Sequence, residues 1–325
     1  MRTGLIRERS KHRAEIVKGI GMIVIIGAGM AGLACARRLA EAGQAAIVLD
    51  KGRGIGGRVA TRREGRMQFD HGAQYVNAHS AAFAAALADS SVADWQDGRG
   101  RTHSVGVTGM SALAKALGKG LDIRQSMQVT QVQPNGTGWR LDLDSETFQA
   151  ERVVVTVPAP QVAGLLGQTH PLVKALDSVR LAPCLTLMAA VSAPPAFISQ
   201  NNPDDDLAWI ALESSKPGRP QDCGSLWVAQ AGEAFSTAHL EKTPDEITAL
   251  MLPMLCERLG VTLDRVTHAA AHRWRYARVT QALGQPFLCN PEGTLYLGGD
   301  WCIGPRVEAA WTSGTAIAQA ILDHA

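Results

Sequence analysis

The sequence predicts an α/β fold in which a nucleotide-binding domain built on a parallel sheet carries an inserted α+β substrate domain. Three observations support this prediction. An apolar strand at 22–27 runs into a glycine-rich turn and a helix, a β-branched strand occupies 152–157, and a third strand precedes Gly-Gly-Asp at 298–300. Continuous apolar runs of this kind are typical of strands buried on both faces of a parallel sheet. The stretch between about 161 and 275 is rich in proline and lacks these motifs.

Hydrophobic periodicity and turn residues give the remaining elements in chain order. Strands are expected at 22–27, 45–50, 68–75, 152–157, 185–191, 225–230 and 294–297, with a β-meander at 122–132 and 138–143. Helices are expected at 30–42, 80–88, 110–117, 244–259 and 307–324. We therefore expect a cofactor-binding domain made of residues 22–78, 102–160 and 276–325, and a substrate domain made of 79–101 and 161–275.

Composition narrows the function class. The chain of 325 residues is 46% hydrophobic, and it has no apolar run of the roughly 18 residues that a membrane span needs. A net charge of +2 argues against a nucleic-acid surface. The six cysteines form no CxxC pair, so we expect no metal site, and reduced thiols indicate a cytoplasmic protein. Residues 1–21 carry six Lys/Arg against two acids and are expected to be a disordered basic extension.

The first motif is a Gly-x-Gly-x-x-Gly turn between the first strand and the first helix, formed by Gly27, Ala28, Gly29, Met30, Ala31 and Gly32. Its first glycine allows the tight turn, the second lets the backbone approach a pyrophosphate, and the third allows the helix to pack on the strand. Asp50 ends the second strand, where an acid accepts the ribose hydroxyls of a dinucleotide. The Rossmann-like spacing predicts a dinucleotide site at the N-terminus of the helix.

The second motif, Lys51 to Thr61, directly follows the ribose acid. Gly57 lets this loop lie against a diphosphate, and Arg58 offers a planar cation to its oxygens. The third motif runs from Phe69 to Tyr75 and contains the small residues Gly72 and Ala73. It resembles a segment that runs past the flavin ring in FAD enzymes of the amine oxidase group. The resemblance implies that the small residues allow close approach of the ring, and that Gln74 and Tyr75 are candidates for contacts to the ring and to the substrate cavity.

The fourth motif, Gly298-Gly299-Asp300, follows the last strand and precedes the C-terminal helix. Asp300 suits a ribityl hydroxyl. The backbone N–H groups near Val307 and Glu308, at the start of the helix, suit the flavin edge where negative charge develops on reduction. Two such half-sites at opposite ends of the chain are hard to explain as coincidence, and the loop at 51–61, which NAD dehydrogenases do not usually carry, favours FAD over NAD.

Together these motifs resemble the renalase-like branch of the flavin-containing amine oxidase superfamily. The resemblance runs from Met22 to the C-terminus and is strongest in three parts: 50–61, 69–75, and the pair 272–277 with 299–302. It implies an amine oxidase/p-hydroxybenzoate hydroxylase-like architecture and FAD bound without a covalent link. The implied cofactor-binding residues are Gly27, Gly29, Met30, Ala31, Gly32, Asp50, Lys51, Gly57, Arg58, Gly72, Ala73, Gln74, Tyr75, Val129, Gly299, Asp300, Val307 and Glu308.

The resemblance also implies a reaction. Renalase-like enzymes oxidise misreduced nicotinamide dinucleotides, the 2- or 6-dihydro isomers of NAD(P)H, and pass the electrons to O2 to give NAD(P)⁺ and H2O2. The candidates for the substrate cavity are Tyr75, His272, Trp274 and Arg306, with Arg273 as a further phosphate partner. No residue is assigned as a catalytic base. Lys216, in the middle block, falls in no matching motif.

Two alternatives stay open. The protein could be a flavin amine oxidase or another FAD-dependent enzyme acting on a C–N or C–C bond, or a protein that binds FAD and catalyses nothing. Each of the three readings predicts a small-molecule ligand and neither a nucleic acid nor a membrane partner. Oligomeric state is not predicted.

Overall fold

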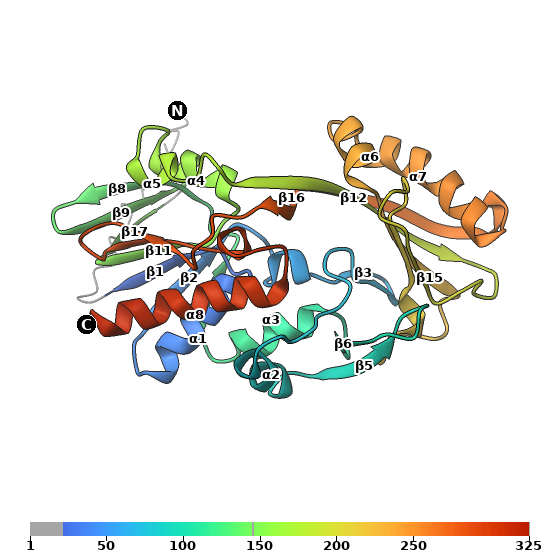
Figure 1. Cartoon of the computed structure of the whole chain (residues 1–325), viewed down its shortest axis with the longest axis horizontal. Helices are drawn as coiled ribbons and strands as arrows, with labels where there is room; N and C mark the ends of the chain where they lie inside the picture. Colours follow the sequence, from blue (N-terminus) through green and yellow to red (C-terminus); the bar gives the residue numbers. More distant parts are fainter. Residues whose placement is uncertain (1–21, 145, 325) are drawn as a thin grey trace, which may run out of the picture.

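The computed structural model describes residues 22–144 and 146–324, and the expectation for residues 1–21 lies outside this range. A parallel sheet with its helices forms one lobe, and an antiparallel sheet forms the other (Figure 1). Strands β12 (Arg180–Val191) and β16 (Val266–Gln281) run side by side between the two lobes.

The first lobe is built on a twisted sheet of α/β type. Its strand order is β17 (Leu288–Cys289), β18 (Leu295–Leu297), β11 (Arg152–Val155), β1 (Ile23–Ile26), β2 (Ala46–Asp50) and β7 (Asp122–Gln125). All neighbours pair in parallel except β17 with β18. The carboxyl ends of β1, β2 and β18 therefore meet at one edge, where ligands bind in open α/β sheets.

Alternate side chains of this sheet enter two separate cores. Ile23 and Ile25 pack with helices α1 (Met30–Glu41), α3 (Ser111–Gly118) and α8 (Val307–Asp323). Val24 and Ile26 pack instead with helix α4 (Ala159–Leu166) and the antiparallel strands β8 (Val129–Asn135), β9 (Gly138–Leu143) and β10 (Thr147–Ala150). Because successive residues of a strand face opposite sides, this double burial explains the unbroken apolar runs.

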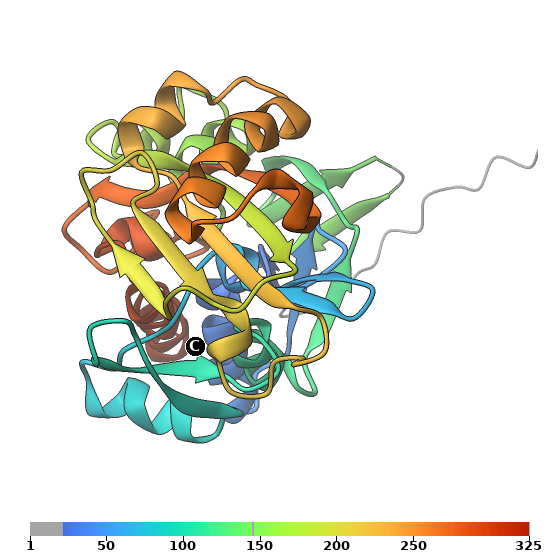
Figure 2. The same ribbon diagram turned by 90° about the vertical axis from the view of Figure 1, so that its right-hand side faces the viewer.

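The second lobe is an antiparallel sheet in the order β13 (Ser199–Asn201), β14 (Trp209–Leu212), β15 (Ser225–Gln230), β12 and β16. Helix α7 (Pro244–Leu259) packs on β12 and β16, and α6 (Glu233–Ala238) packs on β12 (Figure 2). Helix α7 begins with a capping box formed by Thr243 and Glu246, which satisfies otherwise unpaired N–H groups.

Shorter elements complete the described chain. They are hairpins β3 (Arg62–Glu64) with β4 (Met67–Phe69) and β5 (Val92–Gln96) with β6 (Thr102–Gly106), helices α2 (Ala81–Ala88) and α5 (Pro171–Lys174), and 3₁₀ turns Gly57–Val59, Glu213–Ser215, Leu263–Arg265 and Asp300–Cys302.

The α/β fold is confirmed, and most of the expected elements lie within two residues of their predicted bounds. The predicted meander is wrong in part: β7 joins the parallel sheet beside β2, whereas β8 and β9 form a separate sheet with β10. The break falls at Ser126, whose φ of 57° turns the chain between the two sheets. The extended piece expected at 68–75 forms a strand only in β4, because the N–H groups of Asp70 and Ala73 bond to the Glu213 carboxylate and to the Arg58 carbonyl. Strand β16 crosses the expected domain boundary at 275, and that division stays a prediction.

Helices α1 and α8 lie unusually close because Gly314 faces Ala31. A Cβ atom at Gly314 would lie 2.0 Å from the carbonyl oxygen of Ala31. We expect Gly314→Ala to lower the free energy of unfolding by about 1–3 kcal/mol, the usual cost of overpacking. The control is Gly164→Ala in α4, where a Cβ has nothing within 4 Å and improves helix propensity. Urea unfolding of both variants measures this, and equal stability of the two would contradict it.

Candidate functional site

A cavity of about 2420 Å³ lies at the carboxyl edge of the parallel sheet and extends to β16 of the second lobe. Of the residues predicted to bind cofactor or substrate, every one lines this cavity except Gly32. Ligand pockets for single small molecules measure about 300–1,000 Å³, so the space suits a dinucleotide together with a second ligand.

The Gly-x-Gly-x-x-Gly turn has one glycine that faces the cavity and one that faces the protein. A Cβ built on Gly29 meets nothing within 4 Å, whereas a Cβ on Gly32 would lie 1.9 Å from the carbonyl oxygen of Gly27. Helix α1 begins after Gly29 with no side-chain cap and no acid in its first turn. Its first N–H groups are therefore left for an anion in the cavity.

Asp50 joins this turn to the loop that follows β2. One carboxylate oxygen accepts from the N–H of Ala28 and the other from the N–H of Gly52, both at 2.6 Å. The carboxylate therefore lies at the end of β2 with its position set before any ribose is bound. Each oxygen keeps lone pairs that can accept ribose hydroxyls.

The loop of the second motif, residues 51–61, which we call the double-glycine loop, lies directly against the first turn. The N–H of Gly56 donates to the carbonyl of Ala28 at 2.8 Å, and a Cβ on Gly57 would lie 3.6 Å from the Cα of Gly29. Gly72 packs from the other side, since its Cβ would lie 2.1 Å from the carbonyl oxygen of Arg58. Three distant glycine segments are thereby brought to one wall.

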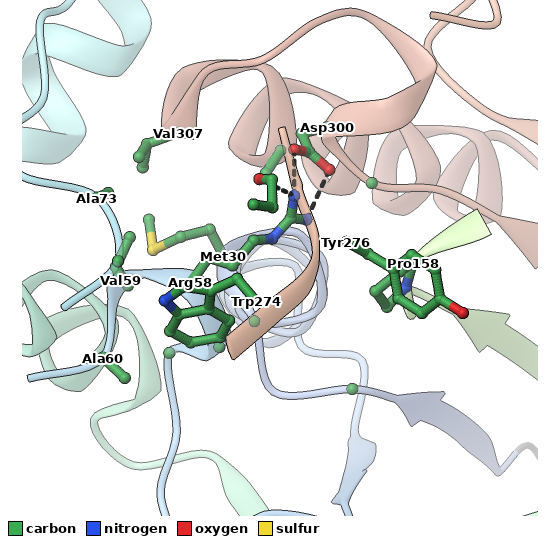
Figure 3. Close-up of a pocket in the computed structure, with 18 of the residues that line it drawn as sticks. Met30, Arg58, Val59, Ala60, Ala73, Pro158, Trp274, Tyr276, Asp300 and Val307 are labelled. Carbon is green, nitrogen blue, oxygen red and sulfur yellow. Dashed lines mark hydrogen bonds and ion pairs between the residues drawn. The ribbon is translucent and has the colours of Figure 1, made fainter. Parts of the chain in front are cut away.

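Arg58 and Asp300 join the two ends of the chain (Figure 3). The guanidinium makes two parallel 2.7 Å hydrogen bonds to the carboxylate, and it also donates to the carbonyl of Ala277 at 3.1 Å. Bidentate arginine–carboxylate pairs are the best-oriented ion pairs in proteins. Figure 3 shows the pair on the cavity wall between Met30 and Tyr276. Arg58, predicted to contact the diphosphate, and Asp300, predicted to contact a ribityl hydroxyl, thus form an ion pair with one another.

The start of α8 also reaches the cavity. Val307 is the first residue of the helix, and Arg306 before it makes no side-chain cap. The Glu308 carboxylate accepts four hydrogen bonds from His79 and Ser80, next to α2. Burial raises the pKa of Glu308, but these hydrogen bonds outweigh burial and hold the pKa below its usual value. Its side chain therefore holds α2, and only its backbone is left for a ligand.

One cavity wall is formed by two histidines and a tryptophan. His71 stacks on Trp274 at 5.1 Å and meets His272 edge-on at 4.8 Å, and the indole N–H of Trp274 donates to the His71 carbonyl at 2.8 Å. Burial, with the nearby His272, lowers the pKa of His71 to about 4. Burial, with Arg62 and Arg273, also lowers the pKa of His272. We call these three side chains the neutral wall, because neither imidazole is charged near pH 7.

Tyr75 also lines the cavity and is held by an aromatic stack. Its ring lies 3.8 Å from that of His103, which contacts Asp97 and Asn77 at 3.1 Å through its two ring nitrogens. The side chain of Gln74 behaves differently. Its amide bonds to the carbonyls of Asp70 and Gly72 and to the ammonium of Lys216, so its polar atoms are used inside the protein.

Behind Gln74 lies a cluster of four buried charges, Asp70, Glu213, Lys216 and Arg219, whose side chains are fully inaccessible. Asp70 bonds to Arg219 and accepts from Thr61 and from the N–H of Met110 at 2.7 and 2.9 Å. Burial raises its pKa, yet Lys216 and Arg219 draw it below the usual value. Burial raises the pKa of Glu213. We call this the buried charge cluster.

Sequence reasoning missed the buried charge cluster and the role of His71 in the neutral wall. The available signal was an acid, Asp70, next to the apolar Phe69, but the partners of Asp70, Lys216 and Arg219, lie almost 150 residues away in the sequence. Arg273, a predicted phosphate partner, instead donates to the carbonyl of Leu240 at 2.7 Å. Arg306 is exposed and lines the cavity as expected.

The charged residues that line the cavity are mostly basic. They are ten cations, Lys51, Arg53, Arg58, Arg62, Arg63, Lys115, Arg273, Arg275, Arg278 and Arg306, and four acids, Asp50, Glu233, Asp300 and Glu308. Every one of the acids has a partner: Glu233 pairs with Arg278 at 2.8 Å, and the other three make the bonds described above. The cavity therefore favours anionic ligands.

No helix within residues 22–144 and 146–324 is both long and apolar enough to cross a bilayer. In the same residues, no group of three His, Cys, Asp or Glu side chains could hold a metal ion. All six cysteines are free thiols, and burial raises the pKa of Cys302 to about 12.

Comparison with known proteins agrees with this geometry. Residues 25–89 match the model of an NAD(P)-binding Rossmann-like domain, and residues 92–322 match that of flavin containing amine oxidoreductases. The chain therefore belongs to the flavin-containing amine oxidoreductase family. It is an FAD-dependent oxidoreductase.

Solved structures support the fold. A crystal structure provisionally named protoporphyrinogen oxidase, from Exiguobacterium sp. 255-15, has a TM-score of 0.73 and 14% identity, covering 94% of this chain and 100% of that one. A putrescine oxidase bound to putrescine has a TM-score of 0.71 and 14% identity, covering 93% and 98%.

The residues described above fit FAD. Gly29 leaves open space at an uncapped helix start, Asp50 offers acceptor positions, and the Arg58–Asp300 pair joins the two half-sites. We propose that the adenosine diphosphate end of FAD lies along α1 and the double-glycine loop. The flavin end then lies between residues 72–75 and the start of α8.

Replacing two glycines of one turn tests this assignment. We expect Gly29→Val to fold with an unchanged melting temperature as apoprotein yet to lose FAD, because its side chain fills only the cavity. We expect Gly32→Val to lower the melting temperature itself, because its Cβ meets the Gly27 carbonyl. Flavin absorbance per chain and thermal unfolding measure both effects. Full flavin content in the Gly29 variant would show that the pyrophosphate lies elsewhere.

Removing one cation from the buried charge cluster should be costly. Lys216→Met leaves Glu213 and Asp70 partly uncompensated, and breaking a buried ion pair in this way costs about 3–5 kcal/mol. The control is Lys242→Met, an exposed lysine 3.9 Å from Glu246, which should change stability little. Denaturant unfolding of both variants gives the comparison, and equal small losses would mean that the cluster is not a structural unit.

Proposed function

We propose that this protein oxidises misreduced dihydronicotinamide dinucleotides, the 2- or 6-dihydro isomers of NAD(P)H, to NAD(P)⁺. Bound FAD supplies the hydride acceptor and passes the electron pair to O2. One substrate molecule, one O2 and one proton then give one NAD(P)⁺ and one H2O2, so electrons and protons balance.

The observation that carries this proposal is the charge of the cavity. An amine substrate enters as an ammonium ion and needs an acceptor, but each carboxylate among the described cavity residues already has a partner. A dinucleotide carries a diphosphate, which suits a cavity lined by ten cations and four acids.

The neutral wall suits the reacting ring. A dihydropyridine that loses a hydride becomes an aromatic cation without losing a proton, so the protein needs no base. His71 and His272 stay uncharged near pH 7 and do not oppose the developing positive charge. Trp274 offers an aromatic face, which attracts a cation. The residues of the wall therefore bind and orient the ring, which is the main contribution a protein makes to such a reaction.

Oxidation of an amine is the second candidate. It is favoured by the family itself and by the likeness to a putrescine oxidase. Lys216 is buried, its ammonium bonds to Glu213 and Gln74, and it does not line the cavity. Among the described cavity residues, an amine therefore finds no carboxylate without a partner.

We further propose that FAD is bound noncovalently and that the protein is cytoplasmic. Cys302, the cysteine nearest the flavin end in sequence, is fully buried, and residues 306–310 contain no cysteine. The six free thiols are typical of a reducing compartment. Acid precipitation tests the first point, because a noncovalent flavin leaves the pellet.

The pH dependence of flavin reduction separates the two candidates. For a dihydronicotinamide isomer we expect a rate nearly constant from about pH 6 to 9, because no substrate proton is lost and His71 titrates only near 4. As pH falls toward 4, the rate should drop, since a cationic imidazole opposes the forming pyridinium. Anaerobic stopped-flow absorbance measures this rate.

For an amine substrate we expect the rate of flavin reduction to depend strongly on pH. Its ammonium form, with a pKa near ~10.4, has no lone pair to assist hydride loss, so reduction rises with pH. A tenfold rise per pH unit with the best substrate would replace our proposal with amine oxidation. A flat profile with a dihydronicotinamide isomer, and no reduction by amines, would support it.

A further inference from the structure

The β3–β4 hairpin brings one arginine beside the neutral wall. Arg62 pairs directly with Phe69 across the hairpin, and residues directly opposite in an antiparallel pair project on the same side. Phe69 in turn stacks on His268 at 5.9 Å. His268 and His272 lie four residues apart on β16 and share one face of the strand. Arg62 therefore lies on the face that presents the wall, and it lines the cavity.

The lowered pKa values of His71 and His272 also indicate that Arg62 lies close to the neutral wall. After burial, which is the largest cause, the positive charge of Arg62 contributes to the lowered pKa of both His71 and His272. A charge acts on two imidazoles in this way only at short range, because water and salt screen more distant groups.

The guanidinium of Arg62 is free to bind a ligand. Its ion-pair partner among the described residues is Glu64 at 3.8 Å, and both side chains are more than half exposed, so this contact is weak. The other arginines near the wall are engaged: Arg63 donates to Thr108 at 2.8 Å, Arg275 binds Glu241 through two bonds, and Arg273 binds the Leu240 carbonyl.

We propose that Arg62 binds the diphosphate of the dinucleotide substrate and makes the enzyme prefer dinucleotides to simpler dihydronicotinamides. This inference rests on the proposed function. With the dihydronicotinamide ring on the neutral wall, the diphosphate is one ribose away from that ring, within reach of the half-exposed Arg62, which lines the same cavity. A planar guanidinium there can make paired hydrogen bonds to phosphate oxygens. Arg62 is thus a substrate-binding residue that sets specificity and takes no part in hydride transfer.

The test compares two arginines of one hairpin. Arg62→Gln removes the proposed contact. The matched control, Arg66→Gln, removes the same charge from a residue that pairs with Asp222 and does not line the cavity. Each holoenzyme is assayed with 6-dihydro-NAD and with the corresponding dihydronicotinamide riboside, which has no phosphate. FAD content is measured in both variants.

We expect Arg62→Gln to raise KM for the dinucleotide by about tenfold or more, as loss of a hydrogen bond to a charged group does, with kcat and FAD content unchanged. The KM for the riboside should stay the same, and Arg66→Gln should behave as wild type. An equal rise for riboside and dinucleotide, or no rise for either, would overturn the assignment. A loss of FAD would mean that Arg62 binds the cofactor instead.

A binding measurement keeps the two proposals separate. NAD⁺ is titrated into the oxidised holoenzyme and followed by perturbation of the flavin absorbance. If NAD⁺ binds and Arg62→Gln weakens this binding about tenfold, the role of Arg62 in binding the diphosphate is supported even when no isomer is oxidised. In that case only the proposed function fails. Absence of NAD⁺ binding to the wild-type holoenzyme, with no oxidation of any isomer, overturns both.

Discussion

The buried carboxylate of Asp70 is the constraint on which the arrangement of the cavity depends. It belongs to the segment that carries His71 and Gly72, and it is held by Arg219 of the second lobe and by Thr61 and Met110 of the first. A charge so completely buried is tolerated only when it is paired, so the two lobes must meet at this point. The neutral wall, the Gly72 contact with Arg58 and the Gln74 amide all follow from where Asp70 is fixed.

Much of the cofactor half of the site could be predicted from the sequence because its determinants are local. Gly27, with a φ of 108°, and Gly32, which packs against it, specify the turn within six residues. The strand before the turn and the acid at the end of β2 are equally short-range features. The apolar runs of β1 and β11 follow directly from burial on both faces.

The parts that were missed depend on partners distant in sequence. Alternation in residues 122–125 indicates a strand but not its neighbour, which proved to be β2. Strand β16 was not predicted, because Arg275 and Arg278 interrupt its apolar pattern, and their partners Glu241 and Glu233 lie more than 30 positions away in the sequence. The buried charge cluster could not be foreseen either, since ionic groups become compatible with burial only when the fold brings all of them together.

The Arg58–Asp300 pair has a consequence for how the protein is made. The two residues are 242 positions apart in the sequence. At the usual synthesis rate of about 5–20 residues per second, Asp300 is therefore made roughly 12 to 48 s after Arg58. During that interval the first three motifs are already synthesised, but the bidentate pair that joins the two half-sites cannot form. A nascent chain therefore cannot complete its cofactor site before Asp300 is made.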